Sequence, residues 1–319
     1  MGQEIEDNVL CYTISIYLMI AKFAPWFRSE KEYDQPPLSY RAWRKMFEKR
    51  YLFGWSSDLF DRIEETDWDL VIILDACRYD YLSQIASSVV VERSISPVCN
   101  TGDFVKKAKE TNVFRGSKYI SVNPRPGEIK PGDVDVIPVW EEKSWDLNLR
   151  TRPPAPVYEK AAKYLNEGEK VVAHTMQPHY PHVCELNGDI RPVPGGLHPE
   201  HLGYNFVDDG IVFQTALCRE INNKHDFDRV RQSYVACAEF AWNKAKDFAI
   251  KMASNGNHVV ITADHGELLG EWGLVSHPGD IGLKSLIEVP WVEITPPRDS
   301  VETEDYSRTD ILRDLGYKD

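Results

Sequence analysis

The sequence predicts an α/β protein built on a doubly wound, mostly parallel sheet that is flanked by helices. Short, continuous runs of β-branched apolar residues are typical of strands buried in a parallel sheet. Stretches of helical length separate these runs, and strands that alternate with helices are typical of a doubly wound fold. The 319 residues are enough for one large domain or two small ones.

The first predicted strand spans residues 70–74 (LVIIL), a continuous apolar run that ends at Asp75. Similar runs predict further strands, at residues 89–91, 118–122, 134–139, 170–176 and 257–262. Helices are predicted at residues 79–86, from about 101 onward, at 156–166 and at 228–254. The stretch from 179 to 227 is rich in Pro, Gly and His, so we expect a lid or an insertion on the substrate side.

Residues 1–66 are predicted to form a helical N-terminal extension, and residues 67–319 the main domain. The extension contains an apolar stretch at 9–24, which polar residues interrupt. It is shorter than the ~20 residues needed to span a bilayer. Two interpretations stay open for this stretch: a helix packed on the main domain, or a helix that docks on a membrane surface or a partner.

The charge balance argues against a nucleic-acid binder. Lys and Arg total 37 against 50 Asp and Glu, a formal net charge of -13, and no basic run offers a grip on phosphate backbones. Six cysteines without a CxxC pair indicate reduced thiols rather than a secreted disulfide framework. We therefore expect a cytoplasmic protein, peripheral at a membrane at most. The sequence leaves the oligomeric state undetermined.

Two predicted strands end in residues of the kinds that bind metals. Asp75 follows the run at 70–74, and Asp264 and His265 follow the run at 257–262. In open α/β sheets, ligands bind beyond the carboxyl ends of the strands, and Zn²⁺ and Mn²⁺ accept mixed oxygen and nitrogen ligands. The sequence therefore indicates a site for a divalent cation, although an Asp after a strand is as often a helix cap.

Thr101 is the best-placed candidate nucleophile. It opens a predicted helix, where free backbone amides help to hold a phosphate, and a cation beside it would acidify its hydroxyl. The local sequence equally favours the alternative that Thr101 only caps the helix. Cys99 is a second candidate, but a lone Cys is more often a buried structural thiol.

Several segments together resemble a known family. LVIILDACRYDYL, the helix-opening Thr101, HTMQPHYPH and VVITADHGELLGEWG, followed by His277 and a VPW segment, are similar to the alkaline phosphatase superfamily in its sulfatase-like branch. The resemblance is to archaeal sulfatase-like proteins and, in motif layout, to lipid A phosphoethanolamine transferases and lipoteichoic acid synthases. It runs from about Asp69 to the C-terminus and implies an alkaline phosphatase-like fold.

Carried over by position, the resemblance implies that four residues bind one divalent cation, zinc or manganese: Asp75, Thr101, Asp264 and His265. It implies that Thr101 is the nucleophile and that His179 and His277 contact the transferred group, a leaving oxygen or a second cation. Both histidines could instead be satisfied loop residues. His174 and His182 flank the site, and we assign them no role beyond support of the ligands.

Three features depart from the family pattern. The sulfatase motif, a Cys followed by x-Pro-Ser-Arg, is absent, because Cys99 is followed by Asn100 and Thr101. Sulfate-ester hydrolysis through formylglycine is therefore not expected. The Asp-x-x-x-His pair of two-zinc phosphatases is missing near 170–176, which favours a single metal. We also find no multi-helix anchor like that of the lipid-linked transferases, so their substrates are not carried over.

These observations predict a metal-dependent hydrolase or transferase of phosphate mono- or diesters, either small molecules or glycan- or lipid-linked compounds. His277 is expected to act in a protonated form. Arg78 could pair with a phosphate oxygen or, as we slightly favour, form salt bridges at a helix start. The alternatives are a sulfohydrolase or phosphomutase of the same fold, and a non-catalytic binding protein that keeps the fold. The presence of all four expected metal ligands argues against the last.

Overall fold

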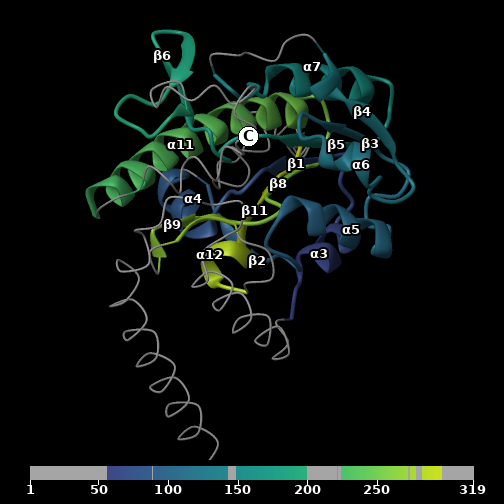
Figure 1. The fold of residues 1–319 in the computed structure, drawn as a ribbon. Coiled ribbons are helices and arrows are strands. Elements are labelled where there is room, and N and C mark those ends of the chain that lie inside the picture. Colours follow the sequence, from purple (N-terminus) through teal and green to yellow (C-terminus); the bar gives the residue numbers. More distant parts are fainter. Residues whose placement is uncertain are drawn as a thin grey trace, which may run out of the picture.

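The computed structural model describes residues 56–87, 89–142, 149–199, 221, 224–271, 274–277 and 282–296. These residues form a central sheet of seven strands with helices on both faces (Figure 1). The strand order is β2-β11-β8-β1-β5-β3-β4. Residues 1–55, and with them most of the predicted N-terminal extension, lie outside the described residues.

The strands of the sheet are β1 (Leu70–Leu74), β2 (Glu92–Ile95), β3 (Lys118–Ser121), β4 (Asp135–Pro138), β5 (Val171–Thr175), β8 (Val259–Thr262) and β11 (Glu288–Ile294). β1 lies between β5 and β8, is parallel to both, and all residues of these three strands are buried. β3 and β4 continue in parallel beyond β5, whereas β11 pairs antiparallel with β8 and β2. The predicted fold class, a mostly parallel sheet flanked by helices, is confirmed.

The helices are α3 (Leu59–Glu65), α4 (Tyr79–Ile85), α5 (Thr101–Thr111), α6 (Arg125–Glu128), α7 (Ala155–Asn166), α11 (Lys224–Ser254) and α12 (Lys284–Ile287), with a short 3-10 turn at Val139–Glu141. α7 and α11 share one face of the sheet, where Tyr158 stacks on Phe248. α3 and α5 cover the other face, where Phe60 and Phe104 pack edge to face (Figure 1). Apolar residues of both helix layers therefore sandwich the buried strands.

Two antiparallel hairpins lie outside the main sheet: β6 (Val183–Leu186) with β7 (Asp189–Pro192), and β9 (Leu268–Leu269) with β10 (Val275–Ser276). The β6–β7 hairpin lies in the region expected to form a lid. Its turn residues Asn187 and Gly188 both have positive φ, 55 and 84, as a two-residue Asn-Gly hairpin turn requires. Residues 200–220 of the expected lid lie outside the described residues.

Two strand predictions differ from the structure. The predicted strand at 89–91 is not a strand, and Val90 is 81% exposed; β2 begins one residue later, at Glu92. β11 was not predicted as a strand. The two errors have one cause, because β2 is defined by its pairing with β11 and not by the local valines. Pairing and burial outweigh intrinsic strand propensity at a sheet edge.

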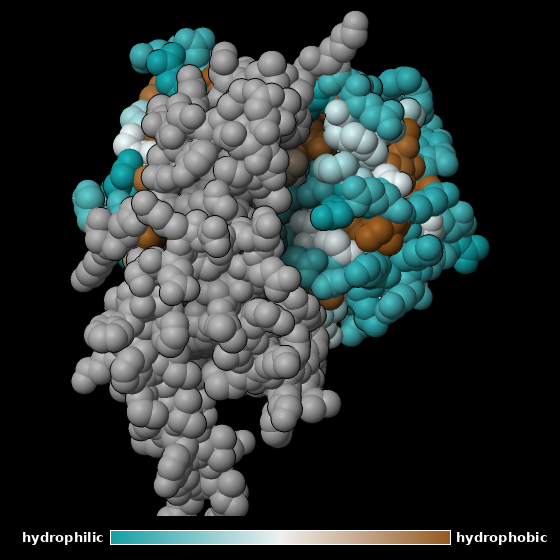
Figure 2. All heavy atoms as spheres, in the orientation of Figure 1, coloured by the Kyte–Doolittle hydropathy of each residue, from teal (hydrophilic) through white to brown (hydrophobic). Residues whose placement is uncertain are grey.

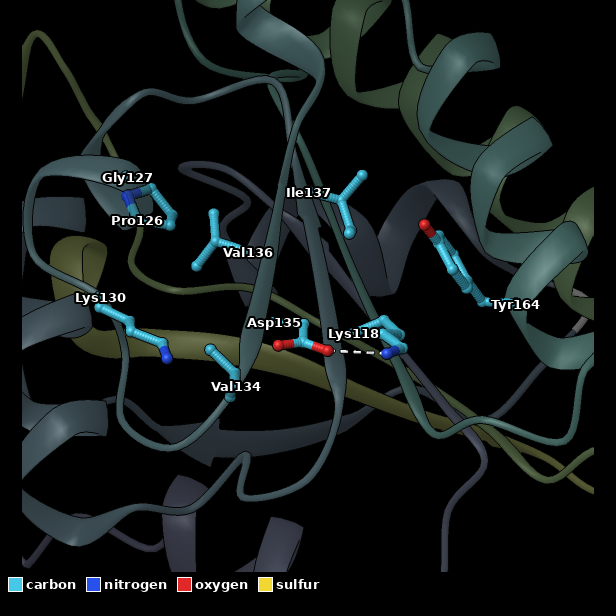
Figure 3. A pocket seen from close by; sticks show the side chains of 9 residues that line it. All are labelled: Lys118, Pro126, Gly127, Lys130, Val134, Asp135, Val136, Ile137 and Tyr164. Atoms are coloured by element: carbon cyan, nitrogen blue, oxygen red, sulfur yellow. Dashed lines mark hydrogen bonds and ion pairs between the residues drawn. The ribbon is translucent and has the colours of Figure 1, made fainter.

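On the face seen in Figure 2, the described residues that are visible are mostly hydrophilic, with some hydrophobic residues among them. Within the described part of the chain, no helix combines the length and the apolarity that crossing a membrane requires. A surface pocket lies at the β3–β4 edge, where Lys118 pairs with Asp135 at 2.7 Å (Figure 3). This ion pair joins the first residues of the two strands, the end opposite to that at which α/β sheets bind ligands.

The central strand should dominate stability. Ile72 in β1 is fully buried, so Ile72→Ala removes apolar contacts and leaves a cavity, and we expect a loss of about 2–5 kcal/mol of unfolding free energy. Ile250 on α11 is 49% exposed, and Ile250→Ala should change stability by less than about 0.5 kcal/mol. Urea titration of both variants measures the difference. Equal effects would contradict this account of the core.

Candidate metal centre

The strand ends bring Asp75, Asp264 and His265 together. Their potential ligand atoms lie within 4.8 Å of one another, and all three residues are fully buried. The strand register explains why they meet. Ile73 in β1 is aligned with Thr262 in β8, and side chains alternate along a strand, so Asp75 and Asp264, each two residues further on, lie on the same face.

A left-handed residue, Ala76, fixes the turn at the end of β1. Its φ is 62, a conformation that costs an L-residue roughly 1–2 kcal/mol. The Tyr234 hydroxyl compensates by donating to the carbonyl of Ala76 at 2.8 Å, while it accepts from the amide of Arg78 at 2.9 Å. The amide of Ala76 in turn donates to Asp264 Oδ1 at 3.1 Å. The turn therefore ties one candidate ligand to the neighbouring strand.

Thr101 lies beside this cluster, as predicted, but it is not the helix cap. The cap of α5 is Asn100, whose Oδ1 accepts from the amide of Asp103 at 2.9 Å. Thr101 is the first helical residue, and its hydroxyl is directed to the cluster, 3.2 Å from His265 Nε2 and 3.5 Å from Asp75 Oδ1. The hydroxyl is therefore available for chemistry, because the neighbouring asparagine satisfies the helix end.

These donor atoms have the spacing of a tetrahedral metal site. Ligands about 2.0–2.2 Å from a zinc ion are separated by about 3.3–3.6 Å at tetrahedral angles. Besides the two Thr101 distances, His265 Nε2 lies 3.4 Å from Asp264 Oδ2 and 3.6 Å from Asp75 Oδ1. His265 Nδ1 is 2.7 Å from the carbonyl of Gly266, to which it donates, so Nε2 presents its lone pair. The set fits a divalent cation.

The two buried carboxylates also favour a bound cation. Burial and the neighbouring Asp264 raise the pKa of Asp75 well above its usual value. Burial opposes ionisation of Asp264 too, but His265, His174 and the amide of Ala76 lower its pKa. Asp264 Oδ2 is buried and has no hydrogen-bond partner among the described residues. A carboxylate oxygen in this state is costly unless an ion binds it.

A second cluster adjoins the first. Potential ligand atoms of His179, Glu267 and His277 lie within 4.8 Å of one another, and the His265 and His277 rings are 4.4 Å apart. Burial and His179 lower the pKa of His277 to about 3, and burial raises the pKa of Glu267 to about 7. A buried imidazole loses the hydration that its charge needs, so burial disfavours the protonated form of His277 in the ligand-free protein. That His277 acts on the substrate in a protonated form stays a prediction.

Two further polar residues lie at the site: Asn123 was not singled out from the sequence, and His174 was named only as a flanking residue that supports the ligands. Asn123, just after β3, donates from Nδ2 to Asp75 Oδ2 at 2.9 Å. His174, in β5, places Nε2 at 3.7 Å from Asp264 Oδ2 and 3.9 Å from Asp75 Oδ2. The available signal was the position of each residue at the carboxyl end of a strand, but the strand order β1-β5-β3 was not known from the sequence.

Two other candidates have structural roles. The Arg78 guanidinium pairs with Asp80 at 2.6 Å and Glu271 at 2.5 Å, and donates to the carbonyl of Glu267. This is the salt-bridged arrangement that we slightly favoured over contact with a phosphate. Cys99 is buried in an apolar cluster with the leucines of β9 and α12, the usual environment of an inert thiol.

None of the protein-family models matches the chain, and no curated protein does. Similar solved structures include the soluble domain of lipooligosaccharide phosphoethanolamine transferase A from Neisseria meningitidis (12% identity, 70% of this chain and 75% of that chain, TM-score 0.47). They include the C-terminal periplasmic domain of EcEptC from Escherichia coli with zinc (9%, 73% and 74%, 0.43). A third is a putative sulfatase from Bacteroides thetaiotaomicron (14%, 71% and 64%, 0.42).

These structures come from the groups of proteins that the sequence motifs resemble, the phosphoethanolamine transferases and the sulfatases. The likeness is confined to the arrangement of sheet and helices, and it assigns no activity. One expectation needs correction. Two of the similar structures, the EptC domains of Escherichia coli and Campylobacter jejuni, are periplasmic domains, which contradicts the cytoplasmic location expected from the cysteine pattern. That expectation is withdrawn.

The buried histidine His182 should make the protein sensitive to acid. Burial lowers its pKa from 6.5 to about 3, so between these values the unfolded chain binds a proton that the folded chain does not. Stability is therefore highest above pH 6.5 and falls as the pH drops toward 3. His182→Gln should reduce the slope by about 1.4 kcal/mol per pH unit between pH 5 and 6.

The control is Ser233→Ala. It removes the hydroxyl that lies 2.8 Å from His182 Nδ1 but leaves the imidazole buried, so overall stability should fall while the slope stays. Urea midpoints across this pH range measure both quantities. A slope unchanged in His182→Gln would refute the assignment.

Proposed function

We propose that this chain is a metal-dependent phosphoryl-transfer enzyme, a hydrolase or transferase of phosphate mono- or diesters, with Thr101 as the nucleophile. The main support is the Thr101 hydroxyl, which occupies one corner of a buried, tetrahedrally spaced set of donor atoms. A threonine that served only as a helix cap would turn its oxygen to the first-turn amides, and Asn100 already does this.

The metal ligands would be Asp75, Asp264, His265 and Thr101. A zinc or manganese ion held there would neutralise phosphoryl charge and lower the pKa of the threonine hydroxyl. The hydroxyl oxygen of Thr101 would then attack phosphorus in line while the bond to the leaving oxygen breaks. The phosphoryl group would stay on Thr101 until water or a second acceptor removes it.

His179 and His277 would act where the leaving group departs and the acceptor arrives. They adjoin the cluster, since the His265 and His277 rings are 4.4 Å apart and the His179 and His277 rings 4.9 Å apart. A neutral imidazole accepts a proton, which suits activation of the incoming water or hydroxyl. Glu267 Oε2, 3.2 Å from His277 Nδ1, would orient that ring. If a second cation bound, its ligands would be His179, Glu267 and His277.

The substrate we propose is a phosphate ester of a small molecule or of a glycan- or lipid-linked compound. Two features favour phosphate over sulfate. The nucleophile is an unmodified hydroxyl, and the sequence lacks the formylglycine motif. A phosphate monoester dianion also gains more from a cation than a sulfate monoanion does, because its charge is larger.

Metal binding should depend on the two strand-end carboxylates. Asp264→Asn keeps the shape but removes the charge of Oδ2, and we expect zinc affinity to fall at least roughly 100-fold. Zinc at 100 times its dissociation constant should stabilise the wild type by about 2.7 kcal/mol and the variant far less. Asp247→Asn, at an exposed site on α11, is the matched control. Elemental analysis and thermal melts test this, and equal zinc content in all three proteins would refute it.

Thr101 should be essential for turnover but not for stability. Thr101→Ala should lower kcat on an aryl phosphate by about 1,000-fold or more, because it removes the oxygen on which the proposed covalent intermediate forms. Thr101→Ser keeps the hydroxyl and should retain substantial activity. Both should unfold within about 1 kcal/mol of the wild type, since Asn100 caps α5.

Matched aryl phosphate, phosphodiester and sulfate esters provide the assay, with intact mass to trap a phosphorylated Thr101. Wild-type turnover without a phosphorylated species, together with full activity in folded Thr101→Ala, would exclude the threonine mechanism. Faster cleavage of the sulfate ester would favour a sulfohydrolase instead.

A further inference from the structure

We propose that His174, oriented by Tyr119, is a positioning residue of the metal centre, which directs its Nε2–H at the carboxylates of Asp75 and Asp264. The inference rests on the proposed function, because it concerns the same cation. It separates His174 from His182, which the sequence analysis treated alike.

The sheet register places the pair on the metal-binding face. His174 in β5 is aligned with Ile73 in β1 and with Ser121 in β3. Because side chains alternate, Tyr119 lies on the same face as His174, as do the strand-end carboxylates. Four neighbouring strands, β3, β5, β1 and β8, thus bring Tyr119, His174, Asp75 and Asp264 together on this face. All four are fully buried.

Hydrogen bonding fixes the proton on the His174 ring. Tyr119 Oη is 2.9 Å from Nδ1, and among the described residues the hydroxyl has no other hydrogen-bond partner. The phenol must donate to Nδ1 if its own proton is to have an acceptor. A neutral imidazole then holds its single proton on Nε2.

The Nε2 proton of His174 faces the carboxylates of Asp75 and Asp264, and no closer acceptor lies among the described residues. His174 Nε2 and Asp264 Oδ2 are both buried without a hydrogen-bond partner among the described residues, and they lie 3.7 Å apart. That distance is too long for a hydrogen bond. A carboxylate oxygen has two lone pairs, so Asp264 Oδ2 can bind a cation with one and accept from His174 with the other. A protonated Nε2 has no lone pair, and His174 is therefore not itself a ligand.

The neighbouring carboxylate has the complementary arrangement. Asp75 Oδ2, 3.9 Å from His174 Nε2, already accepts from Asn123, while Asp75 Oδ1 faces Thr101 and His265. Each aspartate thus has one oxygen bonded to the protein and one toward the cation site. His174 faces both aspartates, so loss of its N–H should loosen their mutual orientation and weaken cation binding.

Zinc affinity of the purified full-length chain, measured by competition with a chromophoric chelator, tests this. His174→Phe should raise the zinc dissociation constant by about 10- to 100-fold, the usual effect of removing a partner of a metal ligand. His174→Gln, which supplies an N–H, should restore part of the affinity. Tyr119→Phe is nearly isosteric and removes the hydroxyl that fixes the position of the proton on the His174 ring. It should weaken zinc binding less than His174→Phe does.

The control is His182→Phe, because His182 is also buried, also has a hydroxyl beside Nδ1 and also has an unpartnered Nε2, but it has no recorded contact with the aspartates. Its zinc affinity should equal that of the wild type. The Co²⁺ absorption spectrum of His174→Phe should indicate the same coordination number as that of the wild type. A lower coordination number would show that His174 is a ligand and overturn the proposal.

Unchanged zinc affinity in Tyr119→Phe and both His174 variants would also overturn the proposal. If His174→Phe does not fold, the zinc affinity of Tyr119→Phe alone provides the test. A wild type that binds no zinc or manganese would instead refute the proposed function itself.

Discussion

Two carboxylates buried side by side are the constraint on which the rest of the site depends. Asp75 and Asp264 are fully buried at adjacent strand ends, and no Lys or Arg of the described chain is recorded in contact with either. Such a pair repels itself and loses its hydration. The surroundings offset this in part through the Ala76 amide, the Asn123 amide and two imidazoles. The proposed divalent cation would neutralise the remaining negative charge.

The order of the strands in the sheet produces this arrangement. β1 lies between β5 and β8, so residues that leave its carboxyl end have neighbours on both sides. The strained turn at Ala76 and its hydrogen bond to Tyr234 hold that end in place. Tyr234 belongs to α11, on the face of the sheet opposite to α5, so the packing of this helix helps to fix the direction of a candidate ligand, Asp75. Stability and chemistry are coupled here because the same core contacts serve both.

The sequence predicted the parts of the site that have a local signal. An apolar run followed by Asp75, and the DHGE run after the last parallel strand, indicated which side chains lie at strand ends. What could not be predicted depends on partners remote in sequence: the alignment of Ile73 with His174, the contact of Asn123 with Asp75, and the β2–β11 pair at the sheet edge. The choice of Asn100 over Thr101 as the cap was also undecidable locally, because both residues favour that position.

The two clusters differ in charge, and this difference favours a different role for each. The Asp75–Asp264 cluster has excess negative charge and donor atoms at tetrahedral spacing, which suits a resident cation. In the adjoining cluster, burial and the neighbouring His179 lower the pKa of His277 to about 3, and burial raises the pKa of Glu267 to about 7. In the proposed reaction, a phosphate dianion would raise the proton affinity of His277 on arrival. His277 would then bind a proton as the substrate binds and release it to the leaving oxygen.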